Sequence, residues 1–210
     1  MCWSYNASVS FFLIGIISCC ILFLRNSKPL DRFYAIFFGW VVMMQLVEAM
    51  MWKDPECKNG VNRFASNMGW FLNLTQPLVL ALLALNTQGI VHKKVLIVCI
   101  LVYVIIFVNW ILTKKPYNFC TKPLDTEGVY KHHLQWTWTQ DSRYNKILIF
   151  YFILSIIAIM SFIKEPYGKM FMALWGGSLL VSSVFNPFNK AAGAWWCVFA
   201  ASGPVIKLFA

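Results

Sequence analysis

The segment from Trp40 to Trp52, WVVMMQLVEAMMW, is apolar along its whole length except for Gln45 and Glu48. It lies within a longer apolar block, 32–52, and a helix that spans a bilayer needs roughly 20 mostly apolar residues. Six further blocks have the same character, at 8–25, 67–88, 93–113, 145–163, 168–186 and 190–209. The sequence therefore predicts an all-α integral membrane protein in which residues 1–210 form a single domain of seven transmembrane helices.

The composition supports a membrane protein and argues against a nucleic-acid-binding one. The chain is 60% hydrophobic and 12% charged, whereas soluble domains are about a quarter charged. The net charge is +10, but the basic residues are scattered among the segments between the apolar blocks and form no dense run. Charges that flank membrane helices account for this pattern, so we expect no nucleic acid among the partners.

The short loops predict an orientation. Basic residues gather in the segments 25–32, 92–94 and 164–169, and short basic loops favour the cytoplasmic side. The N-terminus is then exoplasmic or lumenal and the C-terminus cytoplasmic, in a viral or host endomembrane or another membrane. The first block has no basic segment before it and no small-residue cleavage site after it, so we expect a permanent helix.

The long segment 114–144 predicts a short β-hairpin over the outer mouth of the bundle. Residues 125–128 have turn chemistry, and LQWTW (Leu134–Trp138) alternates with a period of two. We expect Trp136 and Trp138 in the interfacial aromatic belt; the alternative is that they cap a cavity. Three cysteines, Cys2, Cys57 and Cys120, map to the outer side, where a disulfide can form. A Cys57–Cys120 bridge would join two outer loops, but the sequence leaves the pairing open.

An internal duplication is a further interpretation. The segment PLDRFYAIFFG (29–39) can be laid over PYGKMFMALWG (166–176) without a gap. Proline, a basic residue, an aromatic residue and glycine coincide. Helices one to three and five to seven would then be parallel repeats joined by helix four, a 3+1+3 plan that transporters use. The alternative is chance similarity between apolar helices.

The polar residues inside the apolar blocks are the candidate site. Gln45 and Glu48 lie three residues apart on one helix face, and Asn73 and Gln76 repeat that spacing on the next helix. A lone ionised glutamate in hydrocarbon costs several kcal/mol. We therefore expect these faces to meet each other or a wet cavity in the outer half of the bundle. The alternative is a hydrogen-bonded cluster that only fixes helix packing.

Other residues complete the candidate site. Pro77 removes the backbone donor for the carbonyl of Asn73, and Pro204 has the same effect in the last helix, so both are candidate points of helix opening. Further candidates for ligand contact are Ser182, Trp195 and Trp196. The motifs HExxH, GxSxG and CxxC are absent and no histidine lies mid-helix, so we assign no catalytic residue, no metal and no cofactor.

Three segments carry a resemblance to a known family. MCWS (Met1–Ser4), MQLVEA (Met44–Ala49) and NLTQP (Asn73–Pro77) resemble an uncharacterised family of small multi-span membrane proteins from large DNA viruses and protists. The resemblance implies that Cys2, Trp3 and Ser4 fold back onto the outer polar cluster, and it implies no activity. The repeat plan is separately similar to seven-helix sugar-efflux transporters and opsin-like proteins.

These patterns favour a small-solute or ion transporter, a channel or a ligand-sensing seven-helix bundle. The first alternative is a non-catalytic structural or partner-binding membrane protein of a virus or an endomembrane. The second is a lipid-modifying membrane enzyme, which ranks last because no nucleophile accompanies Glu48. The expected partners are the lipid bilayer and a small solute or ion, and a homo-oligomer is a further option.

Overall fold

The computed structural model describes residues 4–28, 30–86, 92–113, 119–123, 134–140, 142–162, 168–169, 171 and 192–209. Within these residues the chain forms six α-helices, one 3₁₀ helix and a two-stranded sheet. The α-helices are α1 (Tyr5–Arg25), α2 (Asp31–Lys53), α3 (Val61–Leu85), α4 (Lys93–Leu112), α5 (Ser142–Phe162) and α7 (Ala192–Phe209). The strands are β1 (Lys122–Pro123) and β2 (Leu134–Gln135), and the 3₁₀ helix is Thr137–Gln140.

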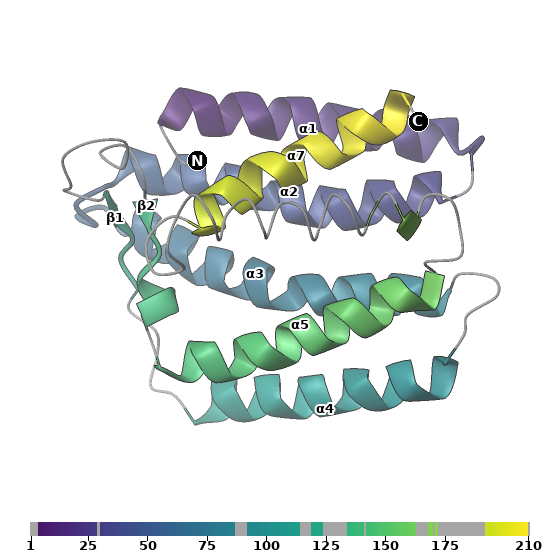
Figure 1. Ribbon diagram of the computed structural model, residues 1–210. Helices are drawn as coiled ribbons and strands as arrows, with labels where there is room; N and C mark the ends of the chain where they lie inside the picture. The colour runs from purple at the N-terminus through teal and green to yellow at the C-terminus, as the bar shows by residue number, and fades with distance from the viewer. Residues whose placement is uncertain are drawn as a thin grey trace.

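The long helices lie side by side, with α1 at one edge of the view and α4 at the other (Figure 1). Helix α2 packs between α1 and α3, α5 packs against α3 and α4, and α7 packs against α1 and α2. We call the end that carries β1 and β2 the hairpin end. The opposite end, where α7 finishes, is the C-terminal end.

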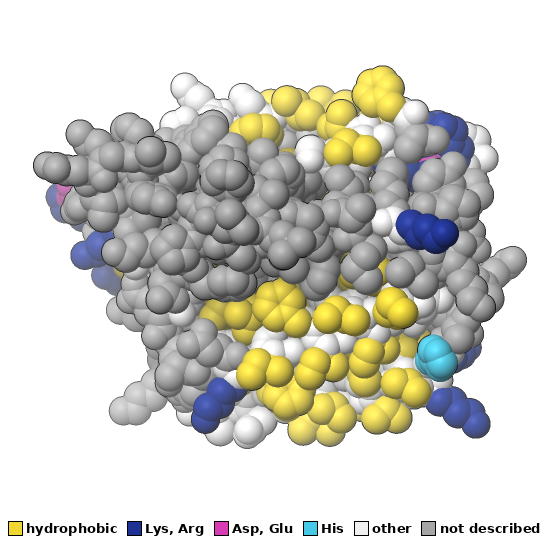
Figure 2. Space-filling view, viewed as in Figure 1, with side chains coloured by type: hydrophobic (Ala, Val, Ile, Leu, Met, Phe, Trp, Pro, Cys, Tyr) yellow, Lys and Arg dark blue, Asp and Glu magenta, His cyan; other side chains and the backbone are white. Residues whose placement is uncertain are grey.

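Among the described residues, four helices, α1 to α4, are long and apolar enough to cross a membrane. Helix α5 contains a shorter apolar stretch, Lys146–Ser161. Most of α2 and α3 is buried, whereas α1 and α4 expose most of their apolar residues. Figure 2 shows hydrophobic side chains across the middle of one face, with lysine and arginine mainly toward the two ends. This distribution is compatible with a multi-pass membrane protein, because hydrocarbon contacts the middle of a bundle and water its ends.

The predicted helix bounds match α1, α2, α4, α5 and α7 to within three residues. Helix α3 differs, because it begins at Val61 and not near residue 67. Gly60 precedes it with a φ of +75°, a conformation that glycine adopts without strain. The segment 168–186 and the duplicated segment 166–176 lie almost entirely outside the described residues. The seventh helix and the repeat therefore stay predictions.

The two paired strands of the predicted hairpin are present, with only two residues each, whereas the predicted turn at 125–128 lies outside the described residues. Lys122 pairs with Gln135 and Pro123 with Leu134 in an antiparallel register. The chain then turns into the 3₁₀ helix, so the alternating pattern of 134–138 does not continue as a strand.

The aromatic-belt interpretation is wrong for the two tryptophans. Trp136 is 7% exposed and Trp138 is fully buried, and their rings stack with centroids 5.1 Å apart. Trp138 fits against α3 at Gly69, where an added Cβ would lie 3.1 Å from its ring. The missing side chain at Gly69 thus makes room for a tryptophan that closes the interior and does not contact the lipid surface.

A disulfide and a hydrogen-bond network fix the hairpin end. Cys57 and Cys120 are bonded, with their Cα atoms 6.1 Å apart, which joins the turn after α2 to the segment before β1. Next to this bond, Asn62 Nδ2 donates to the carbonyl of Thr121 (2.8 Å), and the Thr121 N–H donates to Asn62 Oδ1 (3.0 Å). The Ser66 hydroxyl donates to the Thr121 hydroxyl at 2.8 Å. We call Asn62, Ser66 and Thr121, with the disulfide, the clamp.

Asp54 organises the turn that carries Cys57. Its carboxylate accepts backbone N–H groups from Lys58 (2.8 Å), Asn59 (3.2 Å) and Asn62 (3.3 Å). Burial raises the pKa of Asp54, but these backbone donors outweigh it and hold the pKa below the ordinary value of 3.8. The ionised carboxylate therefore supports the turn that leads into α3.

Candidate functional site

Gln45 and Glu48 lie in the interior of the bundle. This position was predicted, because exposing polar side chains to lipid costs free energy. Gln45 is 1% exposed and Glu48 is 0% exposed. Residues seven positions apart share a helix face, so Gln45 lies on the same face of α2 as Phe38. A Cβ added to Gly203 of α7 would overlap the ring of Phe38. The polar pair of α2 therefore lies on the α7 side of this helix.

Asn73 and Gln76 are also buried, and their partners come from α5. The Tyr144 hydroxyl donates to Asn73 Oδ1 at 3.0 Å, and the Tyr151 hydroxyl donates to Gln76 Oε1 at 2.8 Å. The two tyrosines are seven residues apart, which places them on one face of α5. Sequence reasoning missed them, although this spacing was a signal that could have found them.

One hydrogen bond sets the register between α2 and α3. Trp40 Nε1 donates to the Thr75 hydroxyl at 3.1 Å. At about 1.5 Å of rise per residue, Glu48 then lies about 9 Å from Asn73 and about 13 Å from Gln76 along the helix axes. By the same rise, the four side chains lie at successive levels about 4.5 Å apart, in the order Glu48, Gln45, Asn73 and Gln76 from the hairpin end. Among the described residues, no hydrogen bond joins the pair on α2 to the pair on α3.

Two of these amides retain unused hydrogen-bonding atoms. Gln45 Nε2 and Oε1 and Gln76 Nε2 are buried and have no hydrogen-bond partner within the described structure. Leaving a buried polar group unsatisfied costs about 1–3 kcal/mol. Most buried polar groups in proteins are satisfied by protein or by water, so each exception calls for an explanation. These atoms offer two N–H donor groups and one carbonyl acceptor to a small polar molecule.

Helix α3 continues through Pro77 without interruption. Hydroxyl groups support the backbone just before the proline: Tyr103 of α4 donates to the Leu74 carbonyl at 2.6 Å, and Thr75 donates to the Phe71 carbonyl at 2.8 Å. Such donors stabilise a proline-containing helix within a membrane. Helix α7 likewise contains Pro204, so helix opening at either proline stays a prediction.

The remaining predicted site residues are not brought together in the described structure. Ser182 lies outside the described residues. Trp195 and Trp196 lie in α7, but their side chains are outside the described part. The groups that are described include no cluster of three or more histidine, cysteine, aspartate or glutamate side chains that would hold a metal ion.

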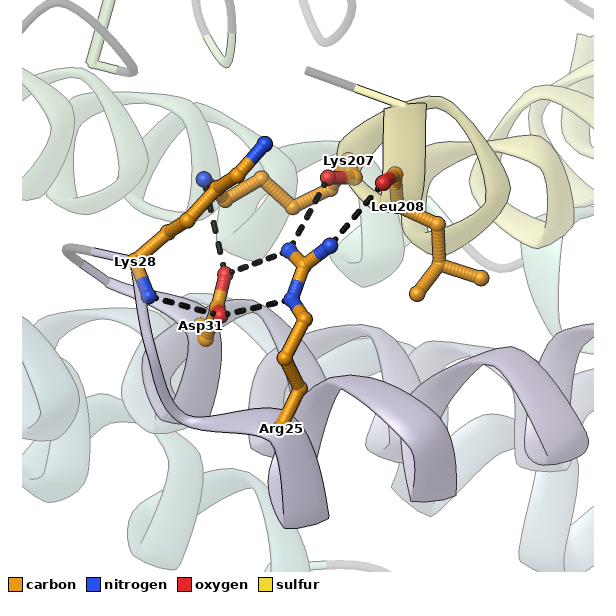
Figure 3. Close-up of polar contacts among 5 residues, drawn as sticks. All are labelled: Arg25, Lys28, Asp31, Lys207 and Leu208. Atoms are coloured by element: carbon orange, nitrogen blue, oxygen red, sulfur yellow. Dashed lines mark hydrogen bonds and ion pairs between the residues drawn. The ribbon is translucent and has the colours of Figure 1, made fainter.

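A second buried polar group, at the C-terminal end, was not predicted. Asp31, the first residue of α2, pairs with Arg25 of α1 at 2.9 Å and with Lys207 of α7 at 3.6 Å (Figure 3). Lys207 is 0% exposed, so its side chain lies in the interior beside Asp31 and not at the surface. The signal was an acidic residue at the start of a membrane helix, between two basic ones.

Comparisons with protein-family models, with curated proteins and with solved structures find no match to this chain.

Proposed function

We propose that this chain is a multi-pass membrane protein that binds a small polar solute or an ion within its bundle, as a transporter, a channel or a ligand sensor. The observation that carries the proposal is the buried amide of Gln45, whose nitrogen and oxygen are unpartnered within the described structure. One helical turn away lies the fully buried carboxyl group of Glu48. Polar residues at such depth inside membrane helices mark solute and ion pathways in many membrane proteins.

The two residues recognise different features of a ligand. In a low-dielectric interior, a carboxylate favours a cation or a proton, since charge interactions are strong there. The Gln45 amide both donates and accepts hydrogen bonds, which suits a neutral polar group. Together they favour a proton, a small cation that keeps part of its water shell, or an organic molecule with an amine and a hydroxyl or amide group.

The successive levels of polar side chains support passage through the interior. A solute that leaves Glu48 and Gln45 next meets Asn73 and Gln76, about 9–13 Å from Glu48 along the axis. The Gln76 amide nitrogen, which has no partner within the described structure, lies at the far end of this series. Weak sites in series allow a ligand to enter and to leave, as conduction requires.

The test uses purified protein in liposomes. Flux of protons, of sodium and potassium, and of a panel of labelled small amines and polyols is measured for wild type, Glu48→Gln and Gln45→Leu. We expect one probe to move through the wild type and both variants to reduce that flux at least tenfold. The matched control is Glu56→Gln, which removes an exposed carboxylate at the hairpin end. Flux that both site variants leave unchanged would refute the proposal.

The second candidate is a structural or partner-binding membrane protein, which we call a scaffold. The clamp and the tyrosine bonds from α5 favour it, because they fix helix positions. A scaffold shows no flux with any probe, and Gln45→Leu then raises its thermal stability without another effect, since the variant removes an unsatisfied amide. Three further predictions fit either candidate. They are the resemblance to the family of small multi-span membrane proteins, an N-terminus on the exoplasmic side, and a homo-oligomer. A lipid-modifying enzyme ranks behind both candidates.

A further inference from the structure

Three helices meet in an ionic cluster at the C-terminal end (Figure 3). Arg25 donates to both carboxylate oxygens of Asp31, at 3.0 and 2.9 Å. It also donates to the backbone carbonyls of Leu208 (2.9 Å) and Lys207 (3.4 Å) in the last turn of α7. The Lys207 ammonium lies 3.6 Å from Asp31 and 5.6 Å from the centre of the Tyr34 ring. We call Arg25, Asp31 and Lys207 the ionic cluster.

The ionic cluster is buried, so each of its charges depends on the opposite charge beside it. The side chains of Asp31 and Lys207 are 0% exposed, and that of Arg25 is 24% exposed. Buried ion pairs lose hydration, so they hold helices together only while every partner is present. Removing one partner leaves a buried charge uncompensated, whereas replacing a whole pair by apolar groups is often neutral or stabilising.

Within the described structure, the last turn of α7 is held by the ionic cluster and by Leu208, which packs against the core. Ile206 and Phe209 point outward, with 39% and 87% of their surfaces exposed. Pro204, one turn earlier, lacks a backbone N–H and weakens the helix at that point. The ionic cluster therefore holds a terminal turn that follows a weak point in its own helix.

The two ends of the bundle are closed by different kinds of contact. At the hairpin end, the Cys57–Cys120 bond is covalent and separates only by reduction. At the C-terminal end, the described contacts are non-covalent and reversible: the ionic cluster and, beside it, the packing of Tyr34 against Phe38 and Phe171. From this difference we infer that the C-terminal end is the end that opens, with the ionic cluster as the latch that holds α7 against α1 and α2. Opening hydrates three charges, which offsets part of the contact energy lost, and this keeps the two states close in free energy.

The test measures distances across both ends by pulsed electron paramagnetic resonance in lipid nanodiscs. Spin labels replace Ser27 and Phe209 at the C-terminal end, or Lys58 and Lys122 at the hairpin end; all four residues are exposed. All other cysteines except the disulfide pair are replaced by alanine. No solute is added, so the outcome does not depend on the proposed transport or sensing.

We expect Asp31→Asn to raise the ratio of long to short distances between positions 27 and 209 more than tenfold, because two cations lose their shared counter-ion. The distance between positions 58 and 122 stays unchanged. The control Glu56→Gln, which removes an exposed ion pair, changes neither distance. An unchanged 27–209 distribution in folded Asp31→Asn would overturn the inference, as would lengthening at the hairpin end.

A second variant keeps the test decisive if Asp31→Asn does not fold. The double substitution Asp31→Leu with Lys207→Met removes the buried pair as a whole and leaves the partly exposed Arg25 bound to the carbonyls of α7. We expect it to fold and to reduce the long-distance population of the wild type at least threefold, because its closed state has no buried charge pair to hydrate. A larger long-distance population in this variant contradicts the latch.

Discussion

Asn62→Ala is the sharpest test of the clamp. Asn62 is fully buried, and its side chain takes part in four hydrogen bonds. It donates to the carbonyls of Thr121 (2.8 Å) and Met51 (3.2 Å), and it accepts from the Ser66 hydroxyl (2.9 Å) and the Thr121 N–H (3.0 Å). The alanine variant loses all four, while the disulfide next to them remains.

The expected cost follows from what each partner retains. The Met51 carbonyl still accepts the Asp54 N–H, and the Thr121 N–H still donates to Ser66. Among the described contacts, only the Thr121 carbonyl loses its partner outright, which costs about 1–3 kcal/mol, and the other three bonds contribute about 0.5–1 kcal/mol each. The better helix propensity of alanine returns about 0.5 kcal/mol. The free energy of unfolding should therefore fall by about 3 kcal/mol.

Thermal unfolding of the protein in detergent measures this loss. For a chain of this size, 1 kcal/mol shifts Tm by about 2–4 °C, so we expect Asn62→Ala to lower Tm by roughly 6–12 °C. The matched control is Asn59→Ala. Asn59 is exposed and contributes only its backbone N–H to the turn. A Tm for Asn62→Ala within a degree of that control would refute the account of the clamp.

Two further predictions concern packing and pH. Gly203→Ala should lower the free energy of unfolding by about 1–3 kcal/mol, because the new methyl group overlaps the buried ring of Phe38. Gly39→Ala should raise the free energy of unfolding by about 0.5–1 kcal/mol, because its new Cβ meets no neighbouring side chain within 4 Å. Thermal unfolding compares the two variants. Because the pKa of Asp54 is lowered on folding, its contribution is complete at neutral pH, declines as the pH falls below about 3.8 and is lost below the folded pKa. Unfolding measured between pH 6 and pH 2 should show this decline in the wild type and a flatter profile in Asp54→Asn.

The positions of the helices were predictable because they depend on the length of apolar runs, which is a property of the sequence alone. The start of helix α3 was not predictable from the length of an apolar run. Residues 61–66 include Asn62 and Ser66, which a rule based on apolar length places outside the membrane helix. In the structure, Thr121 supplies their hydrogen bonds. That partner lies more than fifty residues away, so no local pattern reveals it.

The candidate site was predictable in part for the same reason. Lipid excludes the side chains of Gln45 and Glu48, so their burial follows from the apolar residues around them. Their orientation does not, since the side of α2 that they occupy depends on how α7 packs. The partners of Asn73 and Gln76 come from α5, and the burial of Lys207 depends on Asp31, 176 positions earlier in the chain. Contacts of this kind arise only when the whole chain is assembled.

The disulfide also constrains the order in which the molecule is made. Cys57 and Cys120 are separated by 63 positions, and two membrane-length helices, α3 and α4, lie between them. Synthesis runs from the N-terminus, so the bond closes only after both helices have been inserted and an oxidant reaches the second thiol. In a cell-free or bacterial expression system that keeps this side of the membrane reducing, we expect the helices to form and the Cys57–Cys120 bond at the hairpin end to be absent.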